Sequence, residues 1–391
     1  MKVIHVLTTP ESLCFLKRQA AFIQSHGVEI HAVSSPGCEL EFFGESEQVT
    51  THAVRMTRTV SPLRDAIAVT QLFRIFRRER PNIVHTHTPK ANLVATIAAW
   101  LAGVPCRIVH LHGLPHSTAM GFVRTILRWS TRVPSMLATD LFAVSQSVAD
   151  MAVKDGLCSA GRIKVLGNGS SNGVDVNQFF PAADENVRRR RSLGLSESDL
   201  VIGFAGRLVR DKGVMDLYRS WEQLRDEFPN GYLVIAGQPE LRDAVPTRIL
   251  RCLERDPRVR MLGHCKDMPE FYACLDVFVL PSYREGLPKV ILESAAMAVP
   301  TVAFRSVGCV DAIVDGVTGT LVAAGDCIAL TDALRIYLNR PDLRRRHGIS
   351  ARERVLRDFR PEDVWQATLN QYRIATSLGR STARATISAR R

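Results

Sequence analysis

The residues from Leu280 to Glu293 carry the most specific chemical pattern in the chain. Glu285 falls in a turn after an apolar strand, Gly286 lets a ligand approach the backbone, and Pro288 is placed to begin a helix. Glu293 follows in the early turns of that helix. Carboxylates accept hydrogen bonds from hydroxyl groups, and the N–H groups at a helix N-terminus bind anions. The pattern therefore predicts a ligand with both hydroxyls and phosphate; two solvated surface acids are the alternative.

A second polar segment follows the apolar run from Val201 to Phe204 and contains Gly206, Arg207 and Lys212. A planar guanidinium and a mobile ammonium can together neutralise a diphosphate. If the diphosphate is a leaving group, the same charges stabilise the negative charge that grows as its bond breaks. We therefore predict a diphosphate site here; two solvated surface cations are the alternative.

Five of the eleven histidines lie between His85 and His116. Residues i and i+2 of a strand share a face, so His85 groups with His87, and His110 with His112. Such groups can bind zinc, but no carboxylate or thiol accompanies them at ligand spacing. We therefore predict no metal site. Hydrogen-bonded core histidines are an equal alternative for His85 and His110.

Short apolar runs alternate with helical patterns along most of the chain, which predicts parallel sheets covered on both faces. The fold class is α/β, with two doubly wound halves facing each other across a cleft and ligands at the carboxyl ends of the strands. The expected strands are 3–7, 30–34, 83–86, 107–111 and 141–144, then 201–204, 232–236, 258–262, 277–280, 301–303 and 320–322. Helices are expected at 12–25, 61–80, 90–101, 120–133 and 145–154, and a break at 167–199.

These elements predict a domain organisation. Residues 1–176 are expected to form one Rossmann-like domain, and residues 177–360 a second one. Residues 361–376 form a helix that returns to the first domain. We expect residues 377–391 to be disordered, because the tail from residue 379 onward has four arginines, no acid and few large apolar side chains.

Length and composition exclude several classes of protein. A chain of 391 residues, 46% of them hydrophobic, is too long for one small module. No apolar stretch reaches the ~20 residues of a bilayer span, and the first residues are too quickly polar for a secretory signal. Nine cysteines without a Cys-x-x-Cys pair argue against a disulfide scaffold and fit a reducing cytosol. The formal net charge of +12 attracts anions, but it does not identify which anions bind.

Common nucleotide motifs are missing from the sequence. The glycines of Gly167–Gly173 have the spacing G-x-G-x-x-x-G, which differs from the dinucleotide fingerprint, and they come late in their half. The sequence has neither a G-x-x-x-x-G-K-[ST] loop nor a D-x-D pair. An ordinary NAD enzyme, a P-loop nucleotide site and a metal-chelating carboxylate clamp are therefore disfavoured.

A set of short motifs covers nearly the whole chain. They are Gly206-Arg207-Leu208 with Lys212-Gly213, the E-x7-E of Glu285 and Glu293, Gly308-Cys309, Asp315–Gly319, His85–Lys90, His110–Pro115 and Gly169–Asp175. This combination resembles the retaining glycosyltransferases of family 4, which have the GT-B fold, and most closely their bacterial capsule and O-antigen branch. Many relatives carry paired glycines after the first strand, where Thr8–Ser12 stands in this sequence.

The resemblance implies that residues 1–176 form the acceptor domain, with the membrane face, and that residues 177–360 form the donor domain. It also implies roles for individual residues. Arg207 and Lys212 would hold the nucleotide diphosphate, and Glu293 the ribose hydroxyls. Glu285 and His112 would be catalytic, both touching the donor sugar. Gly206, Gly286 and Leu287 complete the donor site. It also implies retention of the anomeric configuration, no metal and no cofactor, with UDP as the usual nucleotide of the family.

The predicted helix at 120–133 has an apolar stripe and a basic stripe. The apolar residues are Phe122, Ile126, Trp129 and Val133, and the basic residues are Arg124, Arg128 and Arg132. Such a helix can rest on anionic lipid, although packing on its own domain is an equal alternative. Nucleic acid, another anionic surface, has no recognised binding motif in the sequence.

The sequence therefore predicts an enzyme peripheral on the inner face of the cell membrane. It would transfer a hexose or N-acetylhexosamine-type sugar from a nucleotide diphosphate to a polyprenyl-diphosphate-linked sugar, in cell-surface polysaccharide synthesis. His87 and Lys90 are candidate acceptor-binding residues. A nucleotide-sugar epimerase of the same shape and a non-enzymatic nucleotide-sugar binding protein are the alternatives.

Overall fold

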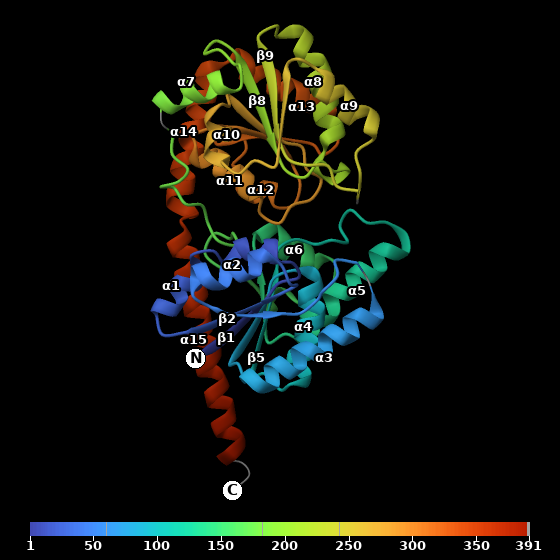
Figure 1. Ribbon diagram of the computed structural model, residues 1–391, viewed down its shortest axis with the longest axis vertical. Coiled ribbons are helices and arrows are strands. Elements are labelled where there is room, and N and C mark those ends of the chain that lie inside the picture. Colours follow the sequence, from blue (N-terminus) through green and yellow to red (C-terminus); the bar gives the residue numbers. More distant parts are fainter. Residues whose placement is uncertain (60, 182, 242, 389–391) are drawn as a thin grey trace. The chain divides into compact units, whose positions relative to one another are not determined.

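The computed structural model describes residues 1–59, 61–181, 183–241 and 243–388 (Figure 1). It divides into two compact units. Unit 1 comprises Met1–Asn172 and Pro361–Arg391, and unit 2 comprises Gly173–Arg360. The first boundary therefore follows residue 172, whereas the sequence suggested residue 176.

Unit 1 is built on one parallel sheet with the strand order β3-β2-β1-β4-β5-β6-β7. Helices lie between successive strands in the chain, as expected for parallel crossovers (Figure 1). The strands are β1 (Lys2–Val6), β2 (Glu29–Ser34), β3 (Thr50–Ala53), β4 (Ile83–Thr86), β5 (Cys106–Leu111), β6 (Asp140–Ala143) and β7 (Ile163–Val165). The helices are η1 (Pro10–Leu16), α1 (Gln19–Ser25), α2 (Cys38–Glu47), α3 (Pro62–Glu79), α4 (Pro89–Leu101), α5 (Gly121–Leu137), α6 (Gln146–Lys154) and η2 (Ala160–Arg162).

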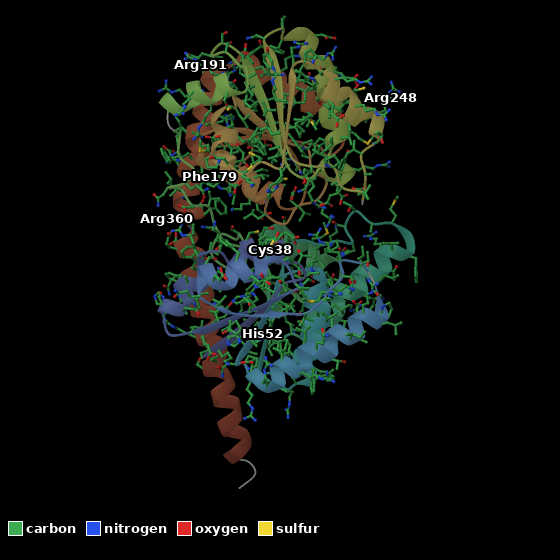
Figure 2. The ribbon with its side chains drawn as sticks, in the orientation of Figure 1. Cys38, His52, Phe179, Arg191, Arg248 and Arg360 are labelled. Carbon is green, nitrogen blue, oxygen red and sulfur yellow. The ribbon has the colours of Figure 1, made fainter. Side chains whose placement is uncertain are left out.

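Unit 2 repeats the plan with a parallel sheet in the order β10-β9-β8-β11-β12-β13. Its core includes Phe179, which reaches it from the segment before the first strand (Figure 2). The strands are β8 (Leu200–Ala205), β9 (Gly231–Ala236), β10 (Val259–Gly263), β11 (Val277–Leu280), β12 (Thr301–Phe304) and β13 (Gly319–Val322). The helices are α7 (Ala183–Ser192), η3 (Arg210–Lys212), α8 (Val214–Glu227), α9 (Thr247–Arg255), α10 (Met268–Ala273), α11 (Lys289–Ala296), α12 (Cys309–Ala312), α13 (Cys327–Asn339) and α14 (Pro341–Asp358).

The predicted fold class is confirmed, because both sheets are parallel and doubly wound. The central strands β4 and β11 are buried along their whole length, as the continuous apolar runs indicated. Prolines at the first turns of α3 and α4 mark their starts. The predicted break at 167–199 contains α7, which its arginines and polar residues had not suggested.

The helix expected at 12–25 is divided into η1 and α1. Arg18 between them adopts the left-handed conformation, with φ 64°. The buried carboxylate of Glu47 accepts hydrogen bonds from the backbone N–H of Arg18 at 2.7 Å and of Ala21 at 3.2 Å, and so caps the start of α1. The prediction missed α2, which supplies this carboxylate from a distant part of the sequence.

The last helix, α15 (Pro361–Ser388), belongs to unit 1 together with the N-terminal sheet. It continues through most of the tail that we expected to be disordered, and residues 389–391 lie outside the described part. The expectation of disorder for residues 377–391 stays a prediction.

Among the described residues, none of the helices is long and apolar enough to span a membrane.

A glycine joins the two loops at the carboxyl ends of β8 and β11. Gly213 has φ 69°, and a Cβ added there would lie 1.9 Å from the carbonyl oxygen of Pro281. Gly263 has a similar φ of 63° but open space around it. These two positions separate the effect of backbone strain from that of a steric clash.

We predict that Gly213→Ala lowers the free energy of unfolding by about 3 kcal/mol or more, because the two loops must move apart. Gly263→Ala should cost about 1–2 kcal/mol, since only the left-handed backbone is penalised. Urea unfolding of both variants measures the difference, and equal losses would contradict the described contact.

Candidate active site

The loops after β8 and β11 in unit 2 are held together through Asp211. Its backbone carbonyl accepts a hydrogen bond from the N–H of Tyr283 at 2.9 Å and another from the Ser282 hydroxyl at 3.2 Å. Its carboxylate accepts a hydrogen bond from the Arg284 guanidinium at 2.7 Å. Asp211 therefore fixes the loop that carries Lys212 against the loop that carries Glu285.

Lys212 and Glu285 form an ion pair, with 2.5 Å between Lys212 Nζ and Glu285 Oε1. Their side chains are 18% and 10% exposed. Burying either charge alone would cost several kcal/mol. Each group therefore compensates the charge of the other in this partly buried position. A partly buried cation beside a carboxylate can meet both a phosphate and a hydroxyl, which is the chemistry predicted from the sequence.

Glu285 and Gly286 are packed against the start of α12. The backbone N–H of Glu285 donates to the carbonyl of Val307 at 3.2 Å. A Cβ added at Gly308 would lie 2.4 Å from the carbonyl oxygen of Gly286, and Gly308 has φ 83°. Only glycine fits this contact. The Gly308-Cys309 motif therefore shapes the loop that holds the catalytic candidate.

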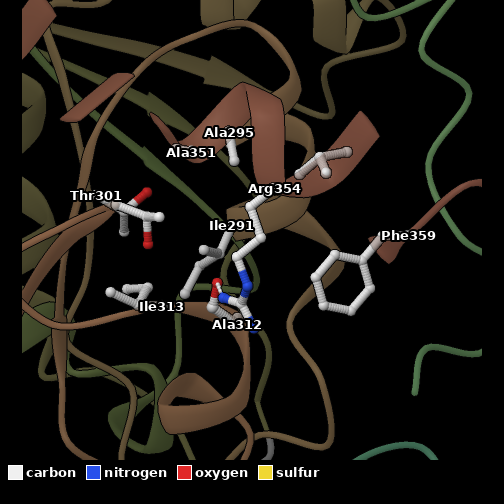
Figure 3. Close-up of a pocket in the computed structure, with 10 residues that line it drawn as sticks. Ile291, Ala295, Thr301, Ala312, Ile313, Ala351, Arg354 and Phe359 are labelled. Atoms are coloured by element: carbon white, nitrogen blue, oxygen red, sulfur yellow. Dashed lines mark hydrogen bonds between the residues drawn. The ribbon is translucent and has the colours of Figure 1, made fainter. Parts of the chain in front are cut away.

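Arg354 of α14 completes this support from behind. Its guanidinium donates to the carbonyl groups of Ala312 at 2.7 Å and of Asp311 at 2.5 Å, which lie at the C-terminal end of α12. Figure 3 shows Arg354 extending beside the Phe359 ring toward Ala312, in a pocket otherwise lined mainly by apolar side chains. This pocket is structural, because the arginine satisfies helix carbonyls within it.

Glu293 lies on α11 with different partners from those of Glu285. Its carboxylate accepts a hydrogen bond from the Tyr272 hydroxyl at 3.1 Å and forms an ion pair with Lys289 at 3.2 Å. Burial raises the pKa of Glu293 above its ordinary value, while Lys289 and Tyr272 oppose that shift. Its predicted contact with ribose hydroxyls stays a prediction.

Of the other predicted donor residues, only Gly206 is shown beside Lys212 in the described residues. Gly206 is close to it, since a Cβ added at Gly206 would lie 3.9 Å from Lys212 Cδ. Arg207 is exposed and pairs with Glu240 at 2.8 Å. Leu287 is partly buried against the core of unit 2. The structure thus brings Gly206, Lys212, Glu285 and Gly286 together, while Arg207 and Glu293 have other protein partners.

A chain of histidine side chains runs along the sheet of unit 1. His5 on β1 and His85 on β4 are paired in register, and His87 and His112 follow β4 and β5. His5 Nδ1 lies 2.8 Å from His87 Nε2, and His87 Nδ1 lies 3.2 Å from His112 Nε2. The Tyr372 hydroxyl of α15 lies 3.4 Å from His5 Nε2 and 2.6 Å from His85 Nδ1. We call Tyr372, His5, His87 and His112 the histidine chain.

The histidine chain is electrically neutral at ordinary pH. Burial lowers the pKa of His5 to about 3 and that of neighbouring His110 to about 3. Burial, together with the other histidines, also lowers the pKa values of His85, His87 and His112. Two triplets, His5 with His85 and His87 and His87 with His110 and His112, have nitrogens within 4.8 Å of one another, which a metal could bridge. That no metal binds there stays a prediction.

The two acceptor candidates are buried in unit 1. His87 is 3% exposed, and its ring nitrogens face His5 and His112. Lys90 Nζ forms an ion pair with Asp65 at 2.6 Å. Both side chains therefore have protein partners in this structure, and their role in acceptor binding stays a prediction.

Helix α5 presents apolar side chains to solvent. Phe122 is 78% exposed and Trp129 is 53% exposed, whereas Thr131, Pro134 and Ser135 form the buried side. The predicted stripe is thus only partly outward, because Ile126 and Val133 are half-buried. The arginines also differ from one another. Arg124 is exposed, Arg132 lies over the Trp129 ring at 5.2 Å, and Arg128 donates to the carbonyl of Asp155 at 2.5 Å.

Sequence reasoning missed several positioning residues. Asp211 lies between the two parts of the motif Gly206-Arg207-Leu208 and Lys212-Gly213, and its place before Lys212 was the only available signal. His5 lies far from the other histidines in the sequence. Its place beside His85 becomes clear only once β1 and β4 are known to pair. Tyr372 and Arg354 contact residues that are far away in the sequence, so the spacing of residues in a motif could not indicate them.

The structure consists of two Rossmann-like units with parallel sheets, and the loops at the carboxyl edge of the second sheet hold an acid against a cation. Residues 199–340 match the family described as "Glycosyl transferases group 1", and residues 15–169 match the one described as "Glycosyl transferase 4-like domain". The chain belongs to this glycosyltransferase family, as its motifs predicted.

The relatives include bacterial polysaccharide enzymes. The chain is 31% identical over 371 residues to the capsular polysaccharide biosynthesis glycosyltransferase CapM of Staphylococcus aureus, covering 95% of this chain and 96% of that protein. It is 27% identical over 282 residues, 71% and 72% of the two chains, to the UDP-Gal:alpha-D-GlcNAc-diphosphoundecaprenol alpha-1,3-galactosyltransferase of Escherichia coli. These relatives fit the capsule and O-antigen branch.

Solved structures share the fold. A crystal structure of Anabaena HepE in complex with UDP and glucose matches with a TM-score of 0.80 at 19% identity, covering 95% of this chain and 99% of that one. Sucrose-phosphate synthase from Thermosynechococcus elongatus matches with a TM-score of 0.79 at 17% identity, covering 97% and 100%.

We predict that acid destabilises unit 1 through its buried histidines. From pH 6.5 down to about 3, unfolded His5 and His110 bind protons that the folded residues do not. The free energy of unfolding should therefore fall with decreasing pH, by up to about 1.4 kcal/mol per pH unit for each histidine. Urea unfolding at about pH 7.5 and about pH 5.5 measures this slope. His110→Gln should make the slope shallower, and an unchanged slope would contradict the account.

Proposed function

We propose that the chain transfers a hexose or N-acetylhexosamine-type sugar from a UDP-sugar to a lipid-linked sugar acceptor in cell-surface polysaccharide synthesis. The observation that carries this proposal is the ion pair of Lys212 and Glu285 between two glycine-shaped loops. The names of the relatives support the substrate classes. The Escherichia coli relative is named for UDP-Gal and a diphosphoundecaprenol acceptor, and HepE was solved with UDP and with UDP-glucose.

In this proposal, the two members of the ion pair divide the work. Lys212 attracts the donor diphosphate and stabilises the charge that grows on it as the bond to the sugar breaks. Glu285 accepts a hydrogen bond from a hydroxyl of the donor sugar, while Glu293 serves the ribose and Arg207 adds a second cation. The cation supplied by the protein replaces the charge that a metal ion would otherwise provide.

The anomeric configuration is retained by a front-side reaction. The bond between the anomeric carbon and the leaving phosphate oxygen breaks, and the acceptor oxygen forms its bond on the same face of the sugar. The acceptor proton passes to the departing phosphate oxygen, so no protein base is required. His112 contributes a hydrogen bond to the donor sugar.

We also propose that α5 docks the enzyme peripherally on the inner face of the cell membrane. Its exposed Phe122 and Trp129 can enter the interface, while Arg124 and Arg132 meet anionic headgroups. A lipid-linked acceptor would then be reached where it resides. Arg128 is left out of this role because it holds the end of α6.

We predict that Glu285→Gln lowers kcat/KM by about 10²–10³-fold, because the amide cannot replace the charge that orients Lys212 and the sugar. Turnover is measured with radiolabelled UDP-sugars and a polyprenyl-diphosphate sugar. Glu227→Gln, which removes an exposed carboxylate paired with Arg335 in the same unit, is the control and should keep full activity. Undiminished turnover by Glu285→Gln would remove it from the catalytic residues.

Product analysis separates the alternatives. A transferase converts the donor only when an acceptor is present, whereas an epimerase forms a new nucleotide sugar without one. A binding protein retains the nucleotide sugar without turnover. Inversion of the anomeric configuration in the product would overturn the front-side mechanism.

We predict that replacing both Phe122 and Trp129 by Glu lowers binding to phosphatidylglycerol-containing vesicles by about 10-fold or more, because apolar burial is lost and repulsion is added. The control replaces Ile328 and Ile336, two exposed residues of α13, by Glu in the same chain. Vesicle flotation measures both variants. Equal binding by the two would assign the membrane contact to another surface.

A further inference from the structure

The histidine chain links the C-terminal helix to the proposed catalytic histidine. Tyr372 of α15 contacts His5, His5 contacts His87, and His87 contacts His112. The ring centroids of His5 and His87 are 5.1 Å apart, and Phe15 stacks on His112 at 4.8 Å. All of these residues belong to unit 1. The histidine chain therefore extends from a buried tyrosine to a half-buried histidine at the carboxyl edge of the sheet.

Neutral imidazole has one N–H donor and one acceptor nitrogen. A chain in which His5 and His87 each use both nitrogens must therefore run head to tail, with all bonds pointing in one direction. Protonation would turn both nitrogens of a ring into donors and break one link. The groups that act electrostatically on these rings are the other histidines, and Cys106 acts on Tyr372. The hydrogen bonds of the histidine chain can therefore all point in one of two directions, and its rings are neutral at neutral pH.

His85 decides between the two directions. Its Nδ1 lies 2.6 Å from the Tyr372 hydroxyl, and its Nε2 is buried without a described hydrogen-bond partner. If Tyr372 donated to His85, the proton of His85 would sit on Nε2 as a buried, unpaired N–H group. If His85 Nδ1–H donates to Tyr372, Nε2 is an unpaired acceptor, which is the less costly case. Tyr372 then donates its own proton to His5 Nε2.

This direction fixes the tautomer at the far end. His5 Nδ1–H donates to His87 Nε2, and His87 Nδ1–H donates to His112 Nε2. The proton of His112 must therefore be on Nδ1. We propose that Tyr372, His5 and His87 are positioning residues that hold His112 neutral with an Nδ1–H group, ready to donate to an oxygen of the donor sugar. This inference rests on the proposed function, since the role of His112 at the sugar belongs to it.

Long-range proton–nitrogen NMR of the ¹⁵N-histidine-labelled full chain tests the tautomer without any substrate. His112→Gln assigns the resonances of His112. We expect the wild-type protein to carry the His112 proton on Nδ1 from about pH 6 to about pH 9, since the pKa of a buried histidine is lowered. A proton on Nε2, or a charged ring in this range, would overturn the proposal.

Three variants test whether the chain transmits this state. Tyr372→Phe removes the hydroxyl, and His87→Leu breaks the middle link; both should give a mixture of His112 tautomers and lower kcat about 10-fold, with KM for the donor nearly unchanged. His87→Gln keeps one donor and one acceptor, and should restore both the Nδ1–H tautomer and most of the activity. Tyr337→Phe, which removes the same hydroxyl from a buried tyrosine–histidine contact with His347 in unit 2, should change neither.

The outcomes distinguish the two proposals. If the His112 tautomer is unchanged in both Tyr372→Phe and His87→Leu, the claim that the histidine chain sets this tautomer is overturned, whatever the activity. Altered tautomers with unchanged kcat would overturn the positioning role. A wild-type protein with the Nδ1–H tautomer but no transfer with every donor and acceptor would instead contradict the proposed function.

Discussion

The proposed site depends on one partly buried ion pair, formed by Lys212 and Glu285 at the carboxyl edge of the sheet in unit 2. Two partly buried charges are stable only while each has a partner, so the loops that carry them must be held close together. The structure meets this requirement with Asp211, which bonds to three groups of the opposite loop. A diphosphate can pair with the cation and a sugar hydroxyl can donate to the carboxylate.

The loops that carry the ion pair are held mainly by residues that have no proposed catalytic or binding role. Gly213 and Gly308 let two backbones approach to distances that a side chain would forbid. Arg354 occupies the carbonyl end of α12, so the helix behind Glu285 is held from the far side. In unit 1, Tyr372 and the buried histidines have the same relation to His112. Both units thus hold one candidate catalytic side chain after a strand through contacts distant in sequence.

The sequence predicted the parts of this arrangement that are local. Apolar runs identified the central strands, proline and glycine marked the loops, and the residue types of Lys212, Glu285 and Glu293 indicated hydroxyl and phosphate ligands. The rest depends on contacts that no periodicity encodes. The break at Arg18 follows from a carboxylate 29 residues away, and Tyr372 meets His85 across 287 residues.

Titration calorimetry with UDP tests the central claim most directly, because it reports the donor site without needing an acceptor. The account predicts that wild-type protein binds UDP without added metal and that Lys212→Met raises Kd by about 10-fold or more, since a charge-assisted contact is lost. Arg340→Met, which removes an exposed cation paired with Asp342 in the same unit, should change Kd far less. Equal affinity of wild type and Lys212→Met for UDP would contradict the claim that this ion pair is the diphosphate site.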